Sequence, residues 1–348
     1  MKAWKKRDCL VCLVVYKESI KKVESLKKLK DVGEKWLIDY INSTLKKLNG
    51  TFLPIGDDAV DLAPTSRLLV SVDMMVQRTD IPEGMNWRDV GYRAITSTTS
   101  DIASKGGRPI AYLTSFALPP DMIIEDFKEL WSGMLEAVEL YGGAIVGGDT
   151  NTGDQVIIDV VCIAEASTKI IPRSGARPGD MVAVTGLFGV EAAGLHALIN
   201  KVERPISRKV IEKMIRPVAR IKEGLILTEF ASASIDSSDG LAESLHLLSE
   251  ASNVGFKIDI PPVDPLALEY SRQVDVDLFD LVFYGGEEYE LVVTIPREYW
   301  SIACTEVEKA GGKLIEIGYV IDQPRVIEIL WDNQYRRLSK RGYLHFTD

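Results

Sequence analysis

Apolar residues recur at intervals of three or four along several stretches of the chain, the spacing that places them on one face of an α-helix. This spacing predicts amphipathic helices over residues 17–41, 86–106, 125–141 and 241–252, and shorter helices over 186–200, 207–214 and 222–230. Gly142-Gly143 ends the third of these, because glycine readily takes the left-handed backbone that closes a helix. In the second, Tyr92, Ile95 and Ala103 are expected to face the core.

Runs of apolar residues without helical spacing alternate with these helices and are predicted strands. They cover residues 68–73, 110–117, 144–146, 155–166, 181–185, 256–260, 315–321 and 326–331, and one more follows the glycine turn within 281–293. Proline and glycine cluster at 166–180, as at a domain boundary. We therefore expect an α/β (α+β) chain with a basic extension over 1–28, an N-terminal mixed-sheet domain over 29–166 and a C-terminal α/β domain over 167–348.

The composition agrees with two globular domains. A chain of 348 residues is too long for one ordinary domain, and 46% hydrophobic with 26% charged residues is typical of a globular protein. The net charge of -10 argues against a general nucleic-acid binder, which needs a positive surplus to displace counterions from phosphates.

The N-terminal segment has some features of a secretion signal but not all of them. Lys5-Lys6-Arg7 precede an apolar run over 9–15, but this run is short, Lys17 interrupts it and no small-residue cleavage pattern follows. The longer apolar stretch 181–199 contains Glu191 and three glycines, so it is expected to be a strand, a turn and a helix. We expect a cytoplasmic protein without a membrane partner.

The cysteines and histidines do not form a recognisable site. Four cysteines are too few and too scattered for a disulfide scaffold. Cys9 and Cys12 have C-x-x-C spacing, but no second cysteine pair or histidine cluster completes a zinc site. His196 and His246 fall in helical segments, where packing is the more common role.

Acidic residues accompanied by glycines stand where predicted strands and helices meet turns. They are Asp57, Asp58, Asp73, Asp101, Asp149, Asp236 and Asp239. Any one of them alone fits a helix cap or a surface turn. Together, without Cys or His, they favour an all-oxygen site for Mg²⁺, Mn²⁺ or Ca²⁺, because a metal ion relieves carboxylate repulsion and bridges the acids to phosphates.

These motifs resemble the thiamine-monophosphate kinase family, which belongs to the aminoimidazole ribonucleotide synthetase superfamily of ATP-dependent enzymes. The resemblance covers about residues 30–346. Its motifs are Gly56-Asp57-Asp58-Ala59, Ser71-Val72-Asp73-Met74, Ser100-Asp101-Ile102-Ala103, Gly147-Gly148-Asp149-Thr150, residues 173–180, Asp236-Ser237-Ser238-Asp239-Gly240-Leu241, residues 285–291 and Gly342-Tyr343-Leu344-His345-Phe346.

The resemblance implies the two-domain aminoimidazole ribonucleotide synthetase-like fold, a homodimer formed through the N-terminal sheets, and a set of ligands. Residues matching the Mg²⁺ positions are Asp58, Ser71, Val72, Asp73, Asp101, Asp149, Asp236 and Asp239. Residues matching the ATP contacts are Gly148, Asp149, Arg173 and Ser238. Thiamine monophosphate would contact Asp80, Glu287 and Tyr343, and the catalytic residues would be Asp149, Arg173 and Asp239.

The activity implied is direct transfer of the ATP γ-phosphoryl group to thiamine monophosphate. Two alternatives stay open: another ATP-dependent enzyme similar to aminoimidazole ribonucleotide synthetase, and a non-catalytic nucleotide-binding regulator. The chain departs from the family pattern in the segment 76–82, which lacks the usual histidine, and at Ser237 and Glu288, where an apolar residue and Asp are usual.

Overall fold

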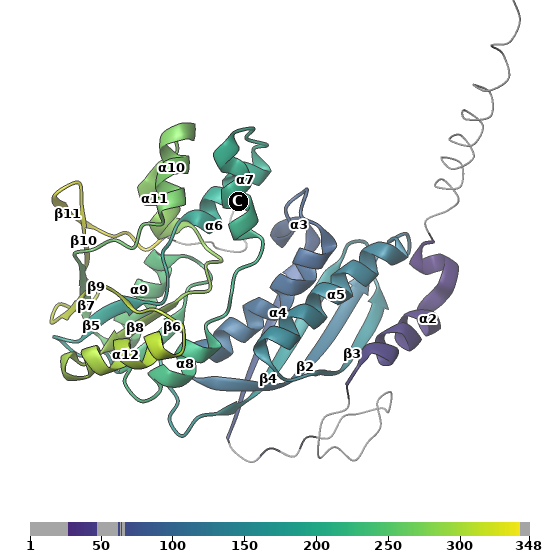
Figure 1. The fold of residues 1–348 in the computed structure, drawn as a ribbon, viewed down its shortest axis with the longest axis horizontal. Coiled ribbons are helices and arrows are strands. Elements are labelled where there is room, and N and C mark those ends of the chain that lie inside the picture. The colour runs from purple at the N-terminus through teal and green to yellow at the C-terminus, as the bar shows by residue number, and fades with distance from the viewer. Residues whose placement is uncertain (1–26, 47–61, 63, 65–66, 342–348) are drawn as a thin grey trace, which may run out of the picture.

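The structure, a computed structural model, contains two β-sheets, one on each side of residue 166 (Figure 1). It describes residues 27–46, 62, 64 and 67–341. The basic N-terminal segment, Asp58 and Tyr343 therefore lie outside the described residues. Within the described ranges, no helix combines the length and apolar character needed to span a bilayer.

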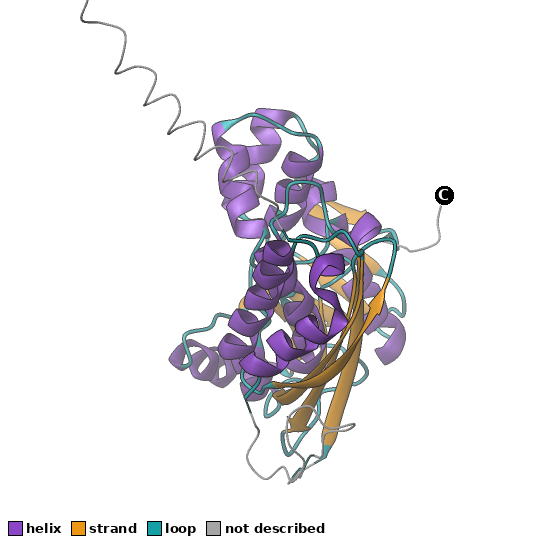
Figure 2. Cartoon of the chain, turned by 90° about the vertical axis from the view of Figure 1, so that its right-hand side faces the viewer, coloured by secondary structure: helices purple, strands orange, loops and turns teal. Residues whose placement is uncertain are grey.

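The first sheet has four strands in the order β1-β4-β2-β3. Their bounds are β1 Leu68–Val76, β2 Gly107–Leu118, β3 Ile145–Thr152 and β4 Ile157–Ala166. Only β2 and β3 pair in parallel; the other neighbours are antiparallel. Helices α4 (Trp87–Ser104) and α5 (Ile124–Tyr141) cover one face, as Figure 2 shows, and α2 (Leu29–Thr44) lies by the β3 edge in Figure 1.

Helices α4 and α5 pack against each other with almost no space between their backbones. A Cβ atom on Gly133 would lie 1.8 Å from the carbonyl oxygen of Arg88, and one on Gly91 would lie 1.8 Å from that of Leu130. The face of α5 that points to the sheet is aromatic, with Phe127 and Trp131 fully buried. This close contact fixes α4, which supplies residues to the site described below.

The second sheet has seven strands in the order β11-β10-β7-β9-β5-β8-β6. Their bounds are β5 Met181–Val184, β6 Ala233–Asp236, β7 Gly255–Ile258, β8 Leu291–Ile295, β9 Ile315–Ile321, β10 Ile327–Trp331 and β11 Gln334–Arg337. Every residue of β5, β6 and β8 is buried, which explains why they lack an alternating pattern.

The helices described in this half all lie between β5 and β9 in the chain. They are α6 Val190–Ile199, α7 Pro205–Met214, α8 Ile221–Leu227, α9 Leu241–Ser252, α10 Pro265–Val274, α11 Leu278–Tyr284 and α12 Trp300–Lys309; a 3₁₀ turn covers Arg297–Tyr299, and the short α3 (Gln77–Asp80) belongs to the first half. The predicted mixed two-domain α/β fold is confirmed, and Tyr92, Ile95 and Ala103 are buried as expected.

Several elements were not predicted from the sequence. Helices α10, α11 and α12, the short α3, and strands β6 and β11 have no counterpart among the expected elements. Capping signals were present for two of them, since the side chains of Asp264 and Asp277 accept from the backbone N–H groups of Leu266 and Phe279, each at 2.7 Å. Their apolar spacing is short, so the caps were the stronger signal.

Two acids expected at strand ends lie inside strands. Strand β1 continues past Asp73 to Val76, and β3 continues through Gly147-Gly148-Asp149 to Thr152. Adjacent glycines are typical of a turn, but glycine also adopts extended backbone. Here Gly147 and Gly148 pair with β2 and continue the strand. The face of the strand on which each acid lies therefore determines which residues its side chain can contact.

We expect Gly133→Ala to destabilise the fold by about 2 kcal/mol or more, because the added methyl group has no room beside the Arg88 carbonyl. The higher helix propensity of alanine, worth about 1 kcal/mol, would offset only part of that loss. Urea unfolding measures the change. Glu139→Ala, an exposed position on the same helix, is the matched control, and equal stability of the two variants would contradict the packing argument.

Candidate functional site

The end of β6 meets helix α4 at a contact between the two halves of the chain. Asp236, the last residue of β6, is buried, and its carboxylate accepts a 2.9 Å hydrogen bond from the Ser100 hydroxyl on α4. One turn further, the Lys105 ammonium donates to the backbone carbonyl of Ser234 at 2.6 Å. Two polar contacts thus join α4 to the strand that leads into the 236–241 loop.

Carboxylates from β1, α4 and the 236–241 loop face one another at this contact. The Ser71 hydroxyl on β1 donates to the Asp101 carboxylate on α4. Burial, followed by the charges of Asp101 and Asp239, raises the pKa of Asp73 to about 6. Burial and Asp101 likewise raise the pKa of Asp236 to about 7. We call Asp73, Asp101, Asp236 and Asp239 the acid cluster.

Two cationic side chains stand beside the acid cluster. Burial and the nearby charge of Arg173 lower the pKa of Lys105 to about 8, while Asp236 and Asp101 act in the opposite direction. The side chain of Arg173 is exposed, at the start of the segment 173–180. Negative and positive groups therefore border the same region, which suits a ligand that carries phosphates and needs charge of both signs around it.

The loop 285–290 lies against the 236–241 loop. The backbone N–H groups of Glu287 and Tyr289 donate to the carbonyls of Ser238 and Ser237 at 2.7 and 3.0 Å. Both donors have positive φ angles, 68° and 53°, which non-glycine residues rarely adopt. Paired loops of this kind hold the Glu287 side chain beside the acid cluster.

Arg93 on α4 is a site residue that the sequence did not reveal. It is only 1% exposed, forms an ion pair with Glu287 and donates to the backbone carbonyl of Met214 at 2.8 Å. Arginine is rarely so buried unless it is paired. The available signal was a single arginine between Gly91 and Ser104, a stretch with no other cation.

Ser237 and Glu288, the two departures from the family pattern, are both buried. The Ser237 hydroxyl has no hydrogen-bond partner among the described residues. One oxygen of Glu288 accepts from the backbone N–H of Gly189 at 3.3 Å, and burial raises its pKa well above the usual range. These side chains therefore point into the C-terminal half, away from solvent.

Asp149 does not join the acid cluster of its own chain. Its register partner is Ser115 on β2, which pairs with Asp159 on β4, whereas Asp73 pairs with buried Val160; Asp149 and Asp73 therefore occupy opposite faces of the sheet. Three strand spacings also separate β3 from β1, roughly 14 Å. Asp149 is exposed on the face that no helix of the described chain covers.

The remaining expected site residues are placed as follows. Val72 is 58% exposed on that same open face, and Gly148 and Ser238 are exposed. The Asp80 carboxylate accepts from the backbone N–H of Val76 at 2.7 Å, so it also caps the turn after β1.

The donor set fits Mg²⁺, although no group of three or more His, Cys, Asp or Glu among the described residues converges closely enough to hold a metal ion unaided. Mg²⁺ is usually held by one or two carboxylates together with water and substrate phosphates. Carboxylates that raise one another's pKa, as Asp101 does for Asp73 and Asp236, are stabilised by an added cation.

The chain matches two family descriptions over most of its length. Residues 56–166 match "AIR synthase related protein, N-terminal domain", and residues 177–330 match the corresponding C-terminal domain. The thiamine-monophosphate kinase of Pyrococcus abyssi is 38% identical over 78% of this chain and 89% of its own length. The chain belongs to the thiamine-monophosphate kinase family. The Bacillus subtilis member is 33% identical over 84% of this chain and 93% of its own.

Solved structures of the thiamine-monophosphate kinase family share the fold. The enzyme from Stenotrophomonas maltophilia superposes with a TM-score of 0.75 at 26% identity, covering 83% of this chain and 94% of its own. A structure described as AaThiL complexed with AMPPCP and TMP superposes with a TM-score of 0.72 at 26% identity, covering 92% and 99%. The hydrogenase maturation protein HypE of E. coli, with a TM-score of 0.73 at 19% identity over 90% and 99%, shows likeness of fold alone.

We expect the unfolding free energy in EDTA to fall as pH rises from 5 to 8. The pKa values of Asp73 and Asp236 are about 6 and 7 in the fold, against about 3.9 in the unfolded chain. The folded state therefore binds more protons above pH 4, and this stability is lost as pH rises through the folded pKa values.

Asp236→Asn should be more stable than the parent protein at pH 8, by on the order of 1–3 kcal/mol, and the difference should shrink toward pH 4. Urea unfolding at several pH values measures it. Asp322→Asn, an exposed position, serves as the control. A loss of stability in Asp236→Asn that is the same at pH 5 and pH 8 would contradict the assigned repulsion.

Proposed function

We propose that this protein is a kinase that transfers the γ-phosphoryl group of ATP directly to the phosphate of thiamine monophosphate, giving thiamine diphosphate and ADP. The observation that carries the proposal is the acid cluster, with Arg173 and Lys105 beside it, in a member of the thiamine-monophosphate kinase family. The relatives' name supplies the acceptor, and the AMPPCP complex of a similar structure supports ATP as donor.

The proposed reaction depends more on neutralising phosphate charge than on a general base that deprotonates the acceptor. The second pKa of a phosphate monoester is about 6, so the acceptor is already largely deprotonated near neutrality. Two anionic phosphates must then approach in line, and their repulsion is the main barrier. Arg173 and Lys105 would attract the phosphates, while α4 and the paired loops hold these groups in fixed positions.

Mg²⁺ completes the proposed site. The acid cluster, the Ser71 hydroxyl, the Val72 backbone and Asp58 would hold it. When bound, the metal would neutralise phosphate charge and supply Lewis-acid chemistry at this site. The carboxylates of Asp73 and Asp236 are suited to this role because burial leaves them short of counter-charge.

Glu287 is proposed to face the cationic ring of thiamine, together with Asp80 and Tyr343. The Arg93 guanidinium holds the Glu287 carboxylate in place from behind, and the Ser238 carbonyl fixes its backbone. Cationic rings are recognised by carboxylates and aromatic faces. No observation favours either alternative, the aminoimidazole-type enzyme or the non-catalytic regulator, and a cytoplasmic location stays a prediction.

A homodimer is proposed because one face of the first sheet is apolar and is not covered by any helix among the described residues. Val70, Val72 and Met74 are 58–63% exposed in a row along β1. Such a patch is typical of an interface. Asp149 lies on the same face, so a second copy packed there would place one chain's Asp149 against the other chain's β1. We propose that Asp149 reaches the acid cluster of the partner around the edge of the partner's sheet, where β1 is the outermost strand.

Asp149→Asn should reduce phosphoryl transfer by at least about a thousandfold, because it removes a carboxylate that would help to hold Mg²⁺ beside the phosphates, while the exposed position leaves the fold intact. A coupled assay for ADP release measures it, with thiamine monophosphate, with an aminoimidazole precursor and without acceptor. Asp154→Asn, also exposed, is the control. Full activity in Asp149→Asn would overturn the proposal.

Mixing the inactive variants Asp73→Asn and Asp149→Asn after joint refolding should restore activity to about one quarter of the parent value, if each site takes one residue from each chain. Half of the randomly formed dimers would be mixed, and each would contain one complete site. Sedimentation analysis checks that dimers form. Absence of restored activity in mixed dimers would show that both residues act within one chain.

A further inference from the structure

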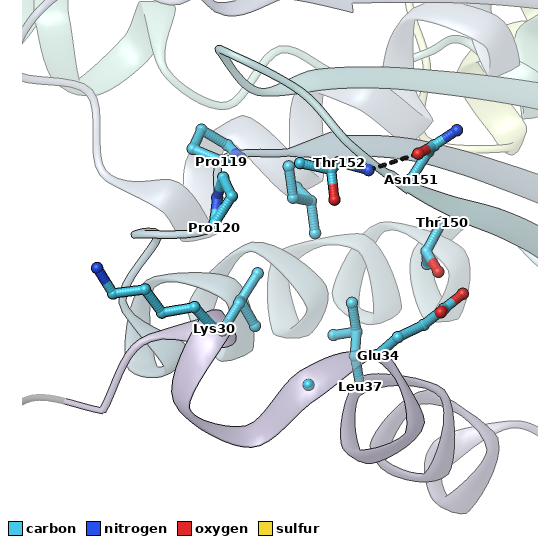
Figure 3. A pocket seen from close by; sticks show the side chains of 11 residues that line it. Lys30, Glu34, Leu37, Pro119, Pro120, Thr150, Asn151 and Thr152 are labelled. Carbon is cyan, nitrogen blue, oxygen red and sulfur yellow. Dashed lines mark hydrogen bonds between the residues drawn. The ribbon is translucent and has the colours of Figure 1, made fainter.

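Two features of the described structure lie apart from the acid cluster. The cavity between α2 and the ends of β2 and β3 (Figure 3) is lined by Thr150, next to Asp149, and belongs with the proposed ATP site. The other feature is a pair of buried carboxyl groups, Glu191 in the first turn of α6 and Glu288 in the loop 285–290. The proposed phosphoryl transfer gives neither of these two a role.

The loop 285–290 contacts both the 236–241 loop and helix α6. A Cβ atom on Gly286 would lie 2.4 Å from the carbonyl oxygen of Ser238. A Cβ atom on Gly285 would lie 2.3 Å from the Cβ of Ala192 on α6. With so little space, a change in the contact between this loop and α6 also moves Glu287, the residue proposed to face the thiamine ring.

The carboxyl groups of Glu191 and Glu288 both lie at the N-terminus of α6. The backbone N–H of Gly189, immediately before α6, donates to Oε1 of Glu288 at 3.3 Å. The Oε2 atoms of Glu191 and Glu288 are buried and have no hydrogen-bond partner among the described residues. Two ionised carboxylates only accept hydrogen bonds, so neither could satisfy the other. A proton on one of them turns it into a donor.

The electrostatic surroundings favour keeping a proton on this pair. Burial, followed by the charge of Glu191, raises the pKa of Glu288 well above its usual range. Burial raises the pKa of Glu191 to about 8; the charges of Glu290 and Asp264 act in the same direction, and that of Lys213 acts against them. Full ionisation of the pair would therefore place two unsatisfied negative charges in the interior.

The charged groups that face the pair from neighbouring elements already have partners. They are Arg93 of α4 with Glu287, Lys213 of α7 with Asp264 before α10, and Arg220 before α8 with Glu290. Helix α11 contacts α6 through the apolar Leu281, and His196 of α6 forms a hydrogen bond with Tyr270 of α10. Each of these cations is thus matched by a carboxylate outside the pair.

We propose that Glu191 and Glu288 share one proton near neutral pH and thereby hold the loop 285–290 in the conformation that binds thiamine monophosphate. The Oε2–H group of Glu288 donates to Glu191. When the pair loses this proton, the two carboxylates repel each other and the loop moves away from α6, so Glu287 no longer faces the substrate. Both are positioning residues. The inference rests on the proposed function, because that function assigns Glu287 to the substrate.

The first experiment measures KM for thiamine monophosphate in the full-length chain from pH 7 to pH 9, where the substrate phosphate is already deprotonated. KM of the parent protein should rise about tenfold, because the pair loses its proton over this range, whereas KM for ATP should not change. Glu288→Gln should keep a low KM throughout, because its amide donates to Glu191 without titrating. Glu203→Gln, an exposed position after α6, is the matched control and should behave as the parent does.

The second experiment needs no substrate and follows urea unfolding in EDTA. Folded pKa values above the unfolded value of about 4.3 give stability that is lost as pH rises through the folded values. The urea midpoint of the parent protein should fall by about 0.5 M between pH 7.5 and pH 9. Glu191→Gln and Glu288→Gln should each remove most of this fall, and Glu203→Gln should not. Circular dichroism checks that each variant folds, and Glu191→Gln repeats the test from the α6 side.

The outcomes separate the shared proton from the proposed function. A urea midpoint whose pH dependence is the same in the parent protein and both Gln variants overturns the shared proton and leaves the kinase proposal standing. A midpoint that responds as expected while KM does not overturns the positioning role. A protein that phosphorylates no thiamine monophosphate at any pH overturns the proposed function, and the urea result then still decides whether the pair holds a proton.

Discussion

The burial of like charges where the two halves meet is the constraint on which the site depends. Asp73, Asp101 and Asp236 each come from a different element, and their mutual repulsion is tolerated because hydroxyls of Ser71 and Ser100 donate to two of them. Buried carboxylates are costly unless they are paired or coordinate a cation. The fold therefore carries an unfavourable arrangement that a phosphate ligand with its metal would relieve.

The type of ligand atoms in the site could be predicted from the sequence, but the arrangement of the residues in space could not. Acids beside glycines, without Cys or His, indicated oxygen ligands, and Asp236 precedes a helix as expected, although the strand that it ends was not predicted. The faces of β1 and β3 were not predictable, because Gly147-Gly148 was interpreted as a turn; register with β2 and β4 comes from pairing between segments distant in sequence.

The Arg93–Glu287 ion pair and two of the C-terminal helices also could not be predicted from the sequence, for physical reasons. Arg93 stands in a helix that is buried around most of its circumference, with both Ile95 and Thr96 buried, so apolar spacing could not show that it pairs with Glu287, almost two hundred positions away. Two helices of the C-terminal half, α10 and α11, begin at side-chain caps and lack long apolar patterns. Fold class and domain content follow from local patterns, while the partners of buried ionic groups follow only from the three-dimensional arrangement.

The contact between the α4 and α5 backbones has a consequence for turnover. With Gly91 and Gly133 each facing a carbonyl of the other helix, α4 has no freedom to slide or tilt without displacing α5 and the sheet beneath it. The acids and hydroxyls that α4 carries then behave as a stiff wall. A movement that admits substrate or releases product would therefore have to come from the paired loops around Ser238 and Glu287, where Glu287 and Tyr289 have strained, positive φ angles.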